Sequence, residues 1–127
     1  MLVKRIVLYC MLVALVPVVC SCAAPTLVGS NAAAYSGGRL HAVASRDMTA
    51  VYQASQTALK ALEIEITDNA KDVFTARVVG MGANGKRIVI SIKPGDGDLT
   101  NFSIKVGSYG DKLRSRRIYE EIQKALK

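Results

Sequence analysis

Apolar residues recur along this chain with two different periods. From Met48 to Leu62 they fall three and four residues apart, which is the spacing of one face of an α-helix. Asp47 directly precedes this stretch and is a favoured helix N-cap residue. The pattern therefore predicts a helix that begins after Asp47 and continues to about Glu63. Its apolar stripe consists of Met48, Val51, Tyr52, Ser55, Ala58, Leu59 and Leu62.

Short stretches on either side of this helix alternate apolar with polar residues, as half-buried antiparallel strands do. The first covers residues 39–45 (RLHAVAS), and four more follow the helix. We therefore expect five strands whose apolar side chains share one face of a sheet. The pattern leaves the position of the first strand in that sheet open. The apolar members of the later four are Ile64 and Ile66; Phe74, Ala76 and Val78; Ile88, Ile90 and Ile92; and Phe102, Ile104 and Val106.

Two loops set the register of these strands. Asn84-Gly85 is typical of a two-residue hairpin turn, but that register would pair Met81 with Ile88 and turn the preceding apolar residues to the wrong face. A three-residue loop over 83–85, with Gly85 in the left-handed conformation, brings the apolar faces together. The loop containing PGDGDL permits a matching register on the other side. The expected pairs are Val78–Ile90, Ala76–Ile92, Ile92–Phe102, Ile90–Ile104 and Ile88–Val106.

Helical spacing returns in the last segment, which starts near Asp111. Glu120 and Lys124 stand there in the favourable i,i+4 order. Two amphipathic helices and one half-apolar sheet predict an α+β two-layer sandwich, a mainly antiparallel five-stranded sheet with two helices on one face, in the order β-α-β-β-β-β-α. The last helix has Ile118, Ile122, Ala125 and Leu126 on its apolar side and Arg116, Glu120, Gln123, Lys124 and Lys127 on the other.

The N-terminus has the pattern of a signal peptide. Lys4 and Arg5 precede an uncharged apolar run over residues 6–19, and small residues follow it. The run is 14 residues long and contains Pro17, whereas a membrane-spanning helix needs about 20 apolar residues. A retained signal anchor is therefore the weaker alternative.

Two cysteines lie one residue apart where this run ends. Val19-Cys20-Ser21-Cys22 resembles the lipobox of bacterial lipoproteins, in which the last cysteine is lipidated and becomes the new N-terminus. The resemblance implies a signal peptide over residues 1–21 and a covalent acyl or diacylglyceryl lipid, with palmitate, at Cys22. Val19, Cys20 and Ser21 would then be the recognition residues before the cleavage site.

Other fates for this segment remain open. Cleavage after Ala24 would give an ordinary secreted protein. A redox or metal-binding Cys-x-Cys is disfavoured, because no histidine or second cysteine pair accompanies it. The lipoprotein resemblance also bears on sorting, since Ala23 is not the aspartate that retains such proteins in the inner membrane. It implies a lipid-anchored protein of the outer membrane that faces the periplasm.

Cleavage before Cys22 would leave 106 residues, enough for one domain. Residues 22–38 are small and uncharged and predict a flexible Ala/Gly-rich tether, with a short helix over residues 31–35 as an alternative. Residues 39–127 would then form a single domain. Loss of Lys4 and Arg5 lowers the formal net charge from +7 to +5, with 15 basic and 10 acidic residues remaining. This excess favours anionic neighbours such as lipid headgroups, glycolipids or cell-wall polymer; no aromatic-studded basic motif indicates nucleic acid.

Few residues favour catalysis. His41 is the one histidine and lies on a predicted strand without a cysteine or obvious serine partner. Asp96 and Asp98 offer fewer ligands than a calcium loop needs and fit a turn better. The glycines of residues 80–85 (GMGANG) are not followed by the helix of a phosphate-binding loop. We expect no enzyme activity, no metal site and no cofactor besides the lipid.

Two groups of basic residues are candidate sites for an anion or a partner. The first is at the start of the last helix, where positive charge opposes the helix dipole. It favours either neighbouring carboxylates, such as Glu120 or Glu121, or an external anion at the N–H groups of Gly110 and Asp111. The second lies on the sheet face away from the helices. An ordinary solvated surface is the plain alternative for both. The first group is Lys112, Arg114, Arg116 and Arg117; the second is Arg77, Arg87, Lys93 and Lys105, together with Val73, Thr75, Val89 and Ser103.

Several segments together resemble one protein family. The capped helix DMTAVYQASQTALKALEIEI, the hairpin NGKRIVISIKP and the closing IKVGSYGDKLRSRRIYEEIQ are similar to the bacterial envelope lipoproteins grouped as domain of unknown function 3568. The most specific part is Val-Gly-x-x-Gly-Asp at residues 106–111, which leads into a helix with Ser-Arg-x-Ile. The resemblance covers nearly the whole chain and implies an envelope lipoprotein domain without an assigned activity.

The sequence thus predicts a lipid-anchored cell-envelope protein. Its domain would be a non-catalytic binding or structural module whose partner is an envelope protein or an anionic glycolipid. The alternative is a periplasmic carrier or sensor of an apolar or anionic ligand, such as a lipid or glycolipid, held between the helix layer and the sheet. An enzyme is the third and weakest class.

Overall fold

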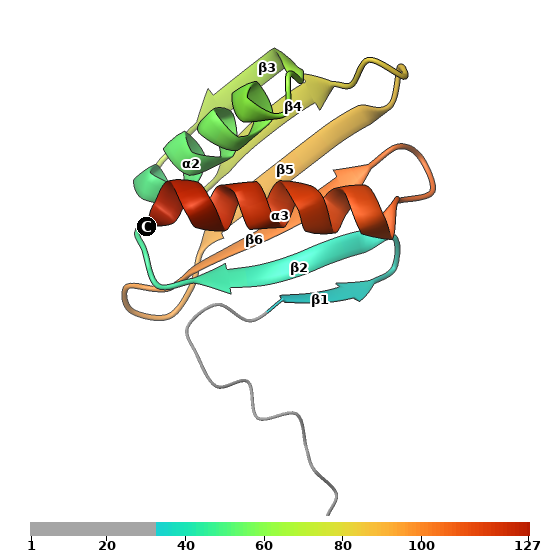
Figure 1. Ribbon diagram of the computed structural model, residues 1–127. Coiled ribbons are helices and arrows are strands. Elements are labelled where there is room, and N and C mark those ends of the chain that lie inside the picture. The colour runs from blue at the N-terminus through green and yellow to red at the C-terminus, as the bar shows by residue number, and fades with distance from the viewer. Residues whose placement is uncertain (1–32) are drawn as a thin grey trace, which may run out of the picture.

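The computed structural model describes residues 33–127; the predicted signal peptide, the lipobox and Cys22 lie outside this range. The chain forms a six-stranded antiparallel sheet with two helices side by side on one of its faces (Figure 1). The predicted α+β fold is confirmed, with six strands rather than five. In chain order the elements are β1 (Ala33–Ser36), β2 (Arg39–Ala44), α2 (Met48–Ala61), β3 (Glu65–Lys71), β4 (Ala76–Met81), β5 (Arg87–Pro94), β6 (Thr100–Val106) and α3 (Lys112–Leu126).

The additional strand is β1, which forms one edge of the sheet in the order β1-β2-β6-β5-β4-β3. It pairs with β2 through a turn at Gly37-Gly38, whose φ angles are 58° and 75°. The tether predicted over 22–38 is therefore wrong for residues 33–38. The described part of the alternative helix is also strand. Only Tyr35 of β1 packs against the core and the other three residues are exposed, so no alternation of apolar residues marked this strand.

The prediction for Phe74 is wrong. We expected its side chain on the apolar face of a strand, but β4 begins only at Ala76 and Phe74 is 73% exposed. Asp72 donates its backbone N–H to the carbonyl oxygen of Thr75 (2.7 Å) and closes a tight turn at this point. The preceding strand β3 is longer than predicted. A bulge interrupts it between Ile66 and Asp68, and the polar residues after the bulge continue it as an edge strand.

The predicted registers of the central strands are confirmed. Val78 pairs with Ile90 and Ala76 with Ile92. Gly85 has a φ of 76°, and its N–H donates to Gly82 O (2.9 Å) within the turn. All three expected β5–β6 pairs are also present. The alternation of apolar and polar residues was sufficient to select these registers, because a shift by one residue would have exposed every isoleucine of β5.

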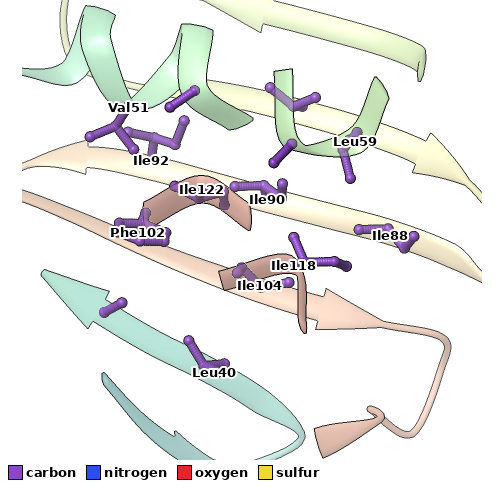
Figure 2. Packing of buried hydrophobic residues seen from close by; sticks show 14 of the residues in the cluster. Leu40, Val51, Leu59, Ile88, Ile90, Ile92, Phe102, Ile104, Ile118 and Ile122 are labelled. Atoms are coloured by element: carbon purple, nitrogen blue, oxygen red, sulfur yellow. The ribbon is translucent and has the colours of Figure 1, made fainter. Parts of the chain in front are cut away.

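Both helices cover the apolar face of the sheet. Asp47 and Asp111 cap their N-termini, with side-chain oxygens that accept the N–H groups of Ala50 and Arg114, each at 3.1 Å. Figure 2 shows Val51 and Leu59 of α2 and Ile118 and Ile122 of α3 gathered over the isoleucines of β5 and β6. The surface of α3 differs from the prediction in one contact: Lys124 pairs with Glu121 (3.0 Å), not with Glu120.

A backbone contact joins the first hairpin to the loop before α3. Gly110 has a φ of 88°, and a side chain there would collide with Gly38 O and the hydroxyl of Tyr35. This contact explains the second glycine of the Val-Gly-x-x-Gly-Asp motif, while Asp111 supplies the helix cap. The motif therefore brings the loop before α3 close to the β1–β2 turn and to the hydroxyl of Tyr35.

We predict that Gly110→Ala destabilises the domain more than Gly85→Ala. Both glycines are left-handed, so each alanine carries a conformational cost of about 1–2 kcal/mol. Gly85 has open space where the methyl group would lie, whereas Gly110 does not. Urea unfolding of both variants measures the difference. Equal losses would show that the contact with Gly38 is not a constraint on the fold.

Candidate functional site

The face of the sheet opposite the helices carries basic and hydroxyl side chains together with apolar ones, such as the Val79–Val89 pair; we call it the open face. Arg77, Arg87, Lys93, Lys105 and Ser103 all lie there, as predicted, because they alternate with core residues along β4, β5 and β6. Val89 joins them on β5. Val73 and Thr75 do not, because they belong to the β3–β4 turn and not to a strand.

A row of aligned residues crosses the open face through all six strands. Ser91 and Ser103 pair with each other at its centre, with Arg77 on one side and His41 on the other. Because the side chains of Ser91 and Ser103 are small, the surface of the sheet is lower at the centre of this row than at the lysines and arginines around it. The complete row is Ala70, Arg77, Ser91, Ser103, His41 and Ala34.

Two shallow hollows lie along this face. The first, of about 680 Å³, surrounds Ser91 and Ser103 and has Arg39, His41 and Lys93 in its lining. The second, of about 600 Å³, reaches the loop before α3 and contains five basic residues. Among residues 33–127, no carboxylate lines either hollow. The acidic residues of the open face, Glu65 and Asp68, lie at its β3 edge. The basic residues of the second hollow are Arg39, Arg77, Lys86, Arg87 and Lys105.

Most cations of this face are unpaired. Within residues 33–127 the ion pairs are Lys86–Asp111, Arg114–Asp111 and Lys124–Glu121. Arg39, Arg77, Arg87, Lys93 and Lys105 therefore have no carboxylate partner in the described part of the chain. Unpaired positive charges gathered on one surface produce a field that attracts anions.

Two members of this surface, Arg39 and His41, were not assigned to it from the sequence. Both lie on β2, which packs between β1 and β6. Their alternation with Leu40 and Ala42 shows that they share a face, but only the position of β2 in the sheet brings that face beside Ser103. The sequence left this position open.

The basic group at the start of α3 does not form one site. Arg114 and Arg117 line a hollow of about 590 Å³ beside the C-terminal end of α2, where Glu63 also lies. Lys112 and Arg116 are exposed and line none of the three hollows described.

The carboxylate of Asp111 occupies the N-terminus of α3. One of its oxygens accepts the N–H of Arg114, and the other lies 3.4 Å from Lys86 Nζ and 3.5 Å from Arg114 Nε. The hydrogen bond from the Arg114 N–H, together with the Lys86 ammonium, holds the pKa of Asp111 below its ordinary value, against a smaller opposing effect of desolvation. The neighbouring carboxylate expected for this cluster is thus Asp111 itself, and Glu121 instead pairs with Lys124.

The residues considered for catalysis lie apart from one another. His41 is exposed on β2, and Asp96 and Asp98 lie in the β5–β6 loop, where the carbonyl oxygen of Asp96 accepts the N–H of Leu99 (3.1 Å). Within residues 33–127, no three histidine, cysteine or acidic residues are grouped as ligands for a metal ion. In the same part of the chain, no helix is long and apolar enough to span a membrane.

The two layers are packed directly against each other. Leu59, Ile90, Ile104 and Ile122 have exposed fractions of zero, so no water-sized space borders these side chains. The described domain therefore gives the carrier hypothesis no space at the centre of the core; the hollow beside the C-terminal end of α2 lies at the edge of the two layers, with Ile88 and Ile118 in its lining. The two hollows on the open face each have basic residues in their lining.

Comparison with known proteins gives a match to a protein family. The model of a family described as "Protein of unknown function (DUF3568)" matches residues 6–125, nearly the whole chain. No curated protein matches the sequence.

The charge on Asp111 generates a prediction about pH. Asp111→Asn keeps an oxygen that can cap α3 but loses attraction to Lys86 and Arg114. Because the pKa of Asp111 is lower in the folded chain than its ordinary 3.8, this stabilisation is present above pH 3.8 and is lost as the pH falls through the folded value. Wild type should therefore be more stable than Asp111→Asn at neutral pH, and this difference in stability should disappear in acid.

Thermal unfolding at several pH values measures this difference. Asp47→Asn is the matched control, since Asp47 caps α2 without an ion pair among the described residues. A stability difference between wild type and Asp111→Asn that stays constant from neutral pH to well below 3.8 would contradict the stabilising role of the charged Asp111 carboxylate.

Proposed function

The chain belongs to the DUF3568 family, whose description names no function, and we propose that it is a lipid-anchored cell-envelope protein whose domain is a non-catalytic binding module. The open face is its binding surface, and the partner is anionic. Cys22 carries the lipid, and the outer membrane, on its periplasmic side, is the proposed location. The lipobox and Ala23 support the anchor and the sorting.

The observation that carries the binding role is the set of unpaired cations on the open face. Both helices cover the opposite face, so this surface is left to solvent across the central strands (Figure 1). A protein gains little stability from exposed cations that lack partners. Five of them around two hollows without carboxylates among the described residues are instead suited to phosphate or carboxylate groups of another molecule.

The partner we favour is an envelope protein or an anionic glycolipid that lies across the Ser91–Ser103 row. Arginine and lysine around a floor of small hydroxyl side chains can pair with charged groups and donate hydrogen bonds to their oxygen atoms. Because these cations are exposed or half-buried, binding should weaken as the salt concentration rises.

Crosslinking in living cells tests the binding surface. A photoreactive residue at Ser91 or Ser103 should capture a defined partner, whereas one at Gln53, exposed on α2, should not. Arg77→Gln with Lys105→Gln should greatly reduce capture from Ser91. Lys60→Gln with Lys127→Gln removes the same charge elsewhere and should leave capture intact. Equal capture from Gln53 and Ser91, or no effect of the Arg77 and Lys105 changes, would contradict the proposal.

Metabolic labelling with palmitate tests the anchor separately. Cys22→Ala should abolish labelling and release the protein from the membrane, because Cys22 is the only proposed acceptor. Cys10→Ala and Cys20→Ala are matched controls that keep Cys22 and should remain labelled. Labelling that survives Cys22→Ala would show that Cys22 is not the lipidated residue and would contradict the proposed anchor.

A further inference from the structure

The β3–β4 turn exposes two large apolar side chains that the binding surface does not use. Val73 is 78% exposed and Phe74 is 73% exposed. The turn is closed by the bond from Asp72 N–H to Thr75 O, and Val73 N–H also donates to Asp72 Oδ1 (2.6 Å). Tight turns usually carry glycine, proline, asparagine, aspartate or serine at their tips. The adjacent valine and phenylalanine on this closed turn are therefore a candidate apolar contact surface.

This tip lies at the end of the sheet where the described chain begins; we call it the proximal end. Ala33, the first residue of β1, and Lys71, the last of β3, belong to the same row of aligned residues. Val73 and Phe74 follow Lys71, so they project beyond that row. The start of β1 and the β3–β4 turn lie at the same end of the strands but at opposite edges of the sheet, because β1 and β3 are its two edge strands (Figure 1). The row is Ala33, Ala42, Phe102, Ile92, Ala76 and Lys71.

The length of chain before Ala33 limits the distance between the proximal end and the proposed lipid. Cys22 precedes Ala33 by 11 residues. Fully extended, 11 residues span at most about 36–40 Å, so Ala33 lies within that distance of the proposed lipid. The eight residues of β5 span about 26 Å. If the strands stand with the proximal end toward the bilayer, the opposite end is farther from it by about the length of a strand.

We propose that Val73 and Phe74 insert into the lipid bilayer to which the chain is anchored, and so orient the domain with its proximal end toward the membrane. The inference rests on the proposed lipid anchor at Cys22. The insertion is apolar rather than electrostatic, because the proximal end carries both signs of charge. Lys71 and Lys93 lie there, but Asp72, Asp96 and Asp98 lie there also.

This orientation has a consequence for the open face. The strands stand away from the bilayer, so the Ser91–Ser103 row remains accessible from the side. Lys86, in the β4–β5 turn, and Arg87, the first residue of β5, lie at the opposite end of the sheet and point away from the membrane. The basic surface thus meets a partner outside the anchoring bilayer and is not neutralised by the lipid headgroups of that bilayer.

Tryptophan fluorescence tests the insertion. The chain contains no tryptophan, so Phe74→Trp introduces a single reporter with little change in shape. Tyr109→Trp is the matched control, because Tyr109 is 96% exposed in the β6–α3 loop at the opposite end. The full acylated chain is reconstituted into vesicles of phosphatidylcholine and phosphatidylethanolamine, with and without brominated acyl chains.

The Phe74→Trp variant should show a blue-shifted emission and several-fold stronger quenching by bromine than the Tyr109→Trp variant. The quenching should persist at about 1 M salt, where the Debye length is about 3 Å. Quenching that disappears in salt would overturn apolar insertion. Unquenched emission from vesicle-bound Phe74→Trp protein would overturn the tip proposal while leaving the anchor intact.

Two further outcomes would also overturn the proposal, each for a different reason. A blue shift of the Phe74→Trp variant that is already complete without vesicles would show that the N-terminal segment or a second copy covers the tip. Protein that fails to float with vesicles and lacks palmitate at Cys22 would remove the anchor, and with it the reason for this orientation.

A double substitution provides an independent measurement of the same contact. Val73→Ser with Phe74→Ser changes only exposed residues, so the free energy of unfolding should stay unchanged. Vesicles should protect the amide groups near this turn from hydrogen exchange in the wild-type chain and protect them less in the double variant. Equal protection of both chains would contradict insertion of the tip.

Discussion

One-sided burial of the sheet is the constraint on which the rest of this structure depends. The alternating residues of β4, β5 and β6 direct alanine, valine, isoleucine and phenylalanine toward α2 and α3. The same alternation directs serine, lysine and arginine to the open face. Since the strand period is two, the register that builds the core also builds the basic surface. The strand register that builds the core therefore also places the basic residues of β4, β5 and β6 together on the open face.

Much of this could be predicted from the sequence, because apolar periodicity is local and strong in the relevant segments. It located both helices, the registers around Ile90 and the four basic residues of the central strands. The signal failed where a strand carries few buried side chains. The strand β1 has one partly buried residue, Tyr35, and the second half of β3 is polar. The alternation of Phe74, Ala76 and Val78 placed Phe74 in a strand, but the Asp72–Thr75 turn left it in solvent.

The site was less predictable than the fold, because it depends on contacts between distant segments. Arg39 and His41 reach Ser103 only because β2 inserts between β1 and β6. Asp111 pairs with Arg114 of the basic group at α3 and with Lys86 from another turn. Such pairings separate cations that have a carboxylate partner in the described domain from those that have none there. The latter are concentrated on the open face, opposite the helices.

The proposals give the domain distinct surfaces: an apolar tip for the bilayer, a helix layer that completes the core, and a basic face for a partner. The central claim concerns the basic face. Acetylation of lysines in intact cells, compared with that in the purified protein, tests it most directly. The account predicts that Lys105 is protected in cells while Lys60 on α2 reacts equally in both. Equal reactivity of Lys105 in cells and in purified protein would contradict it.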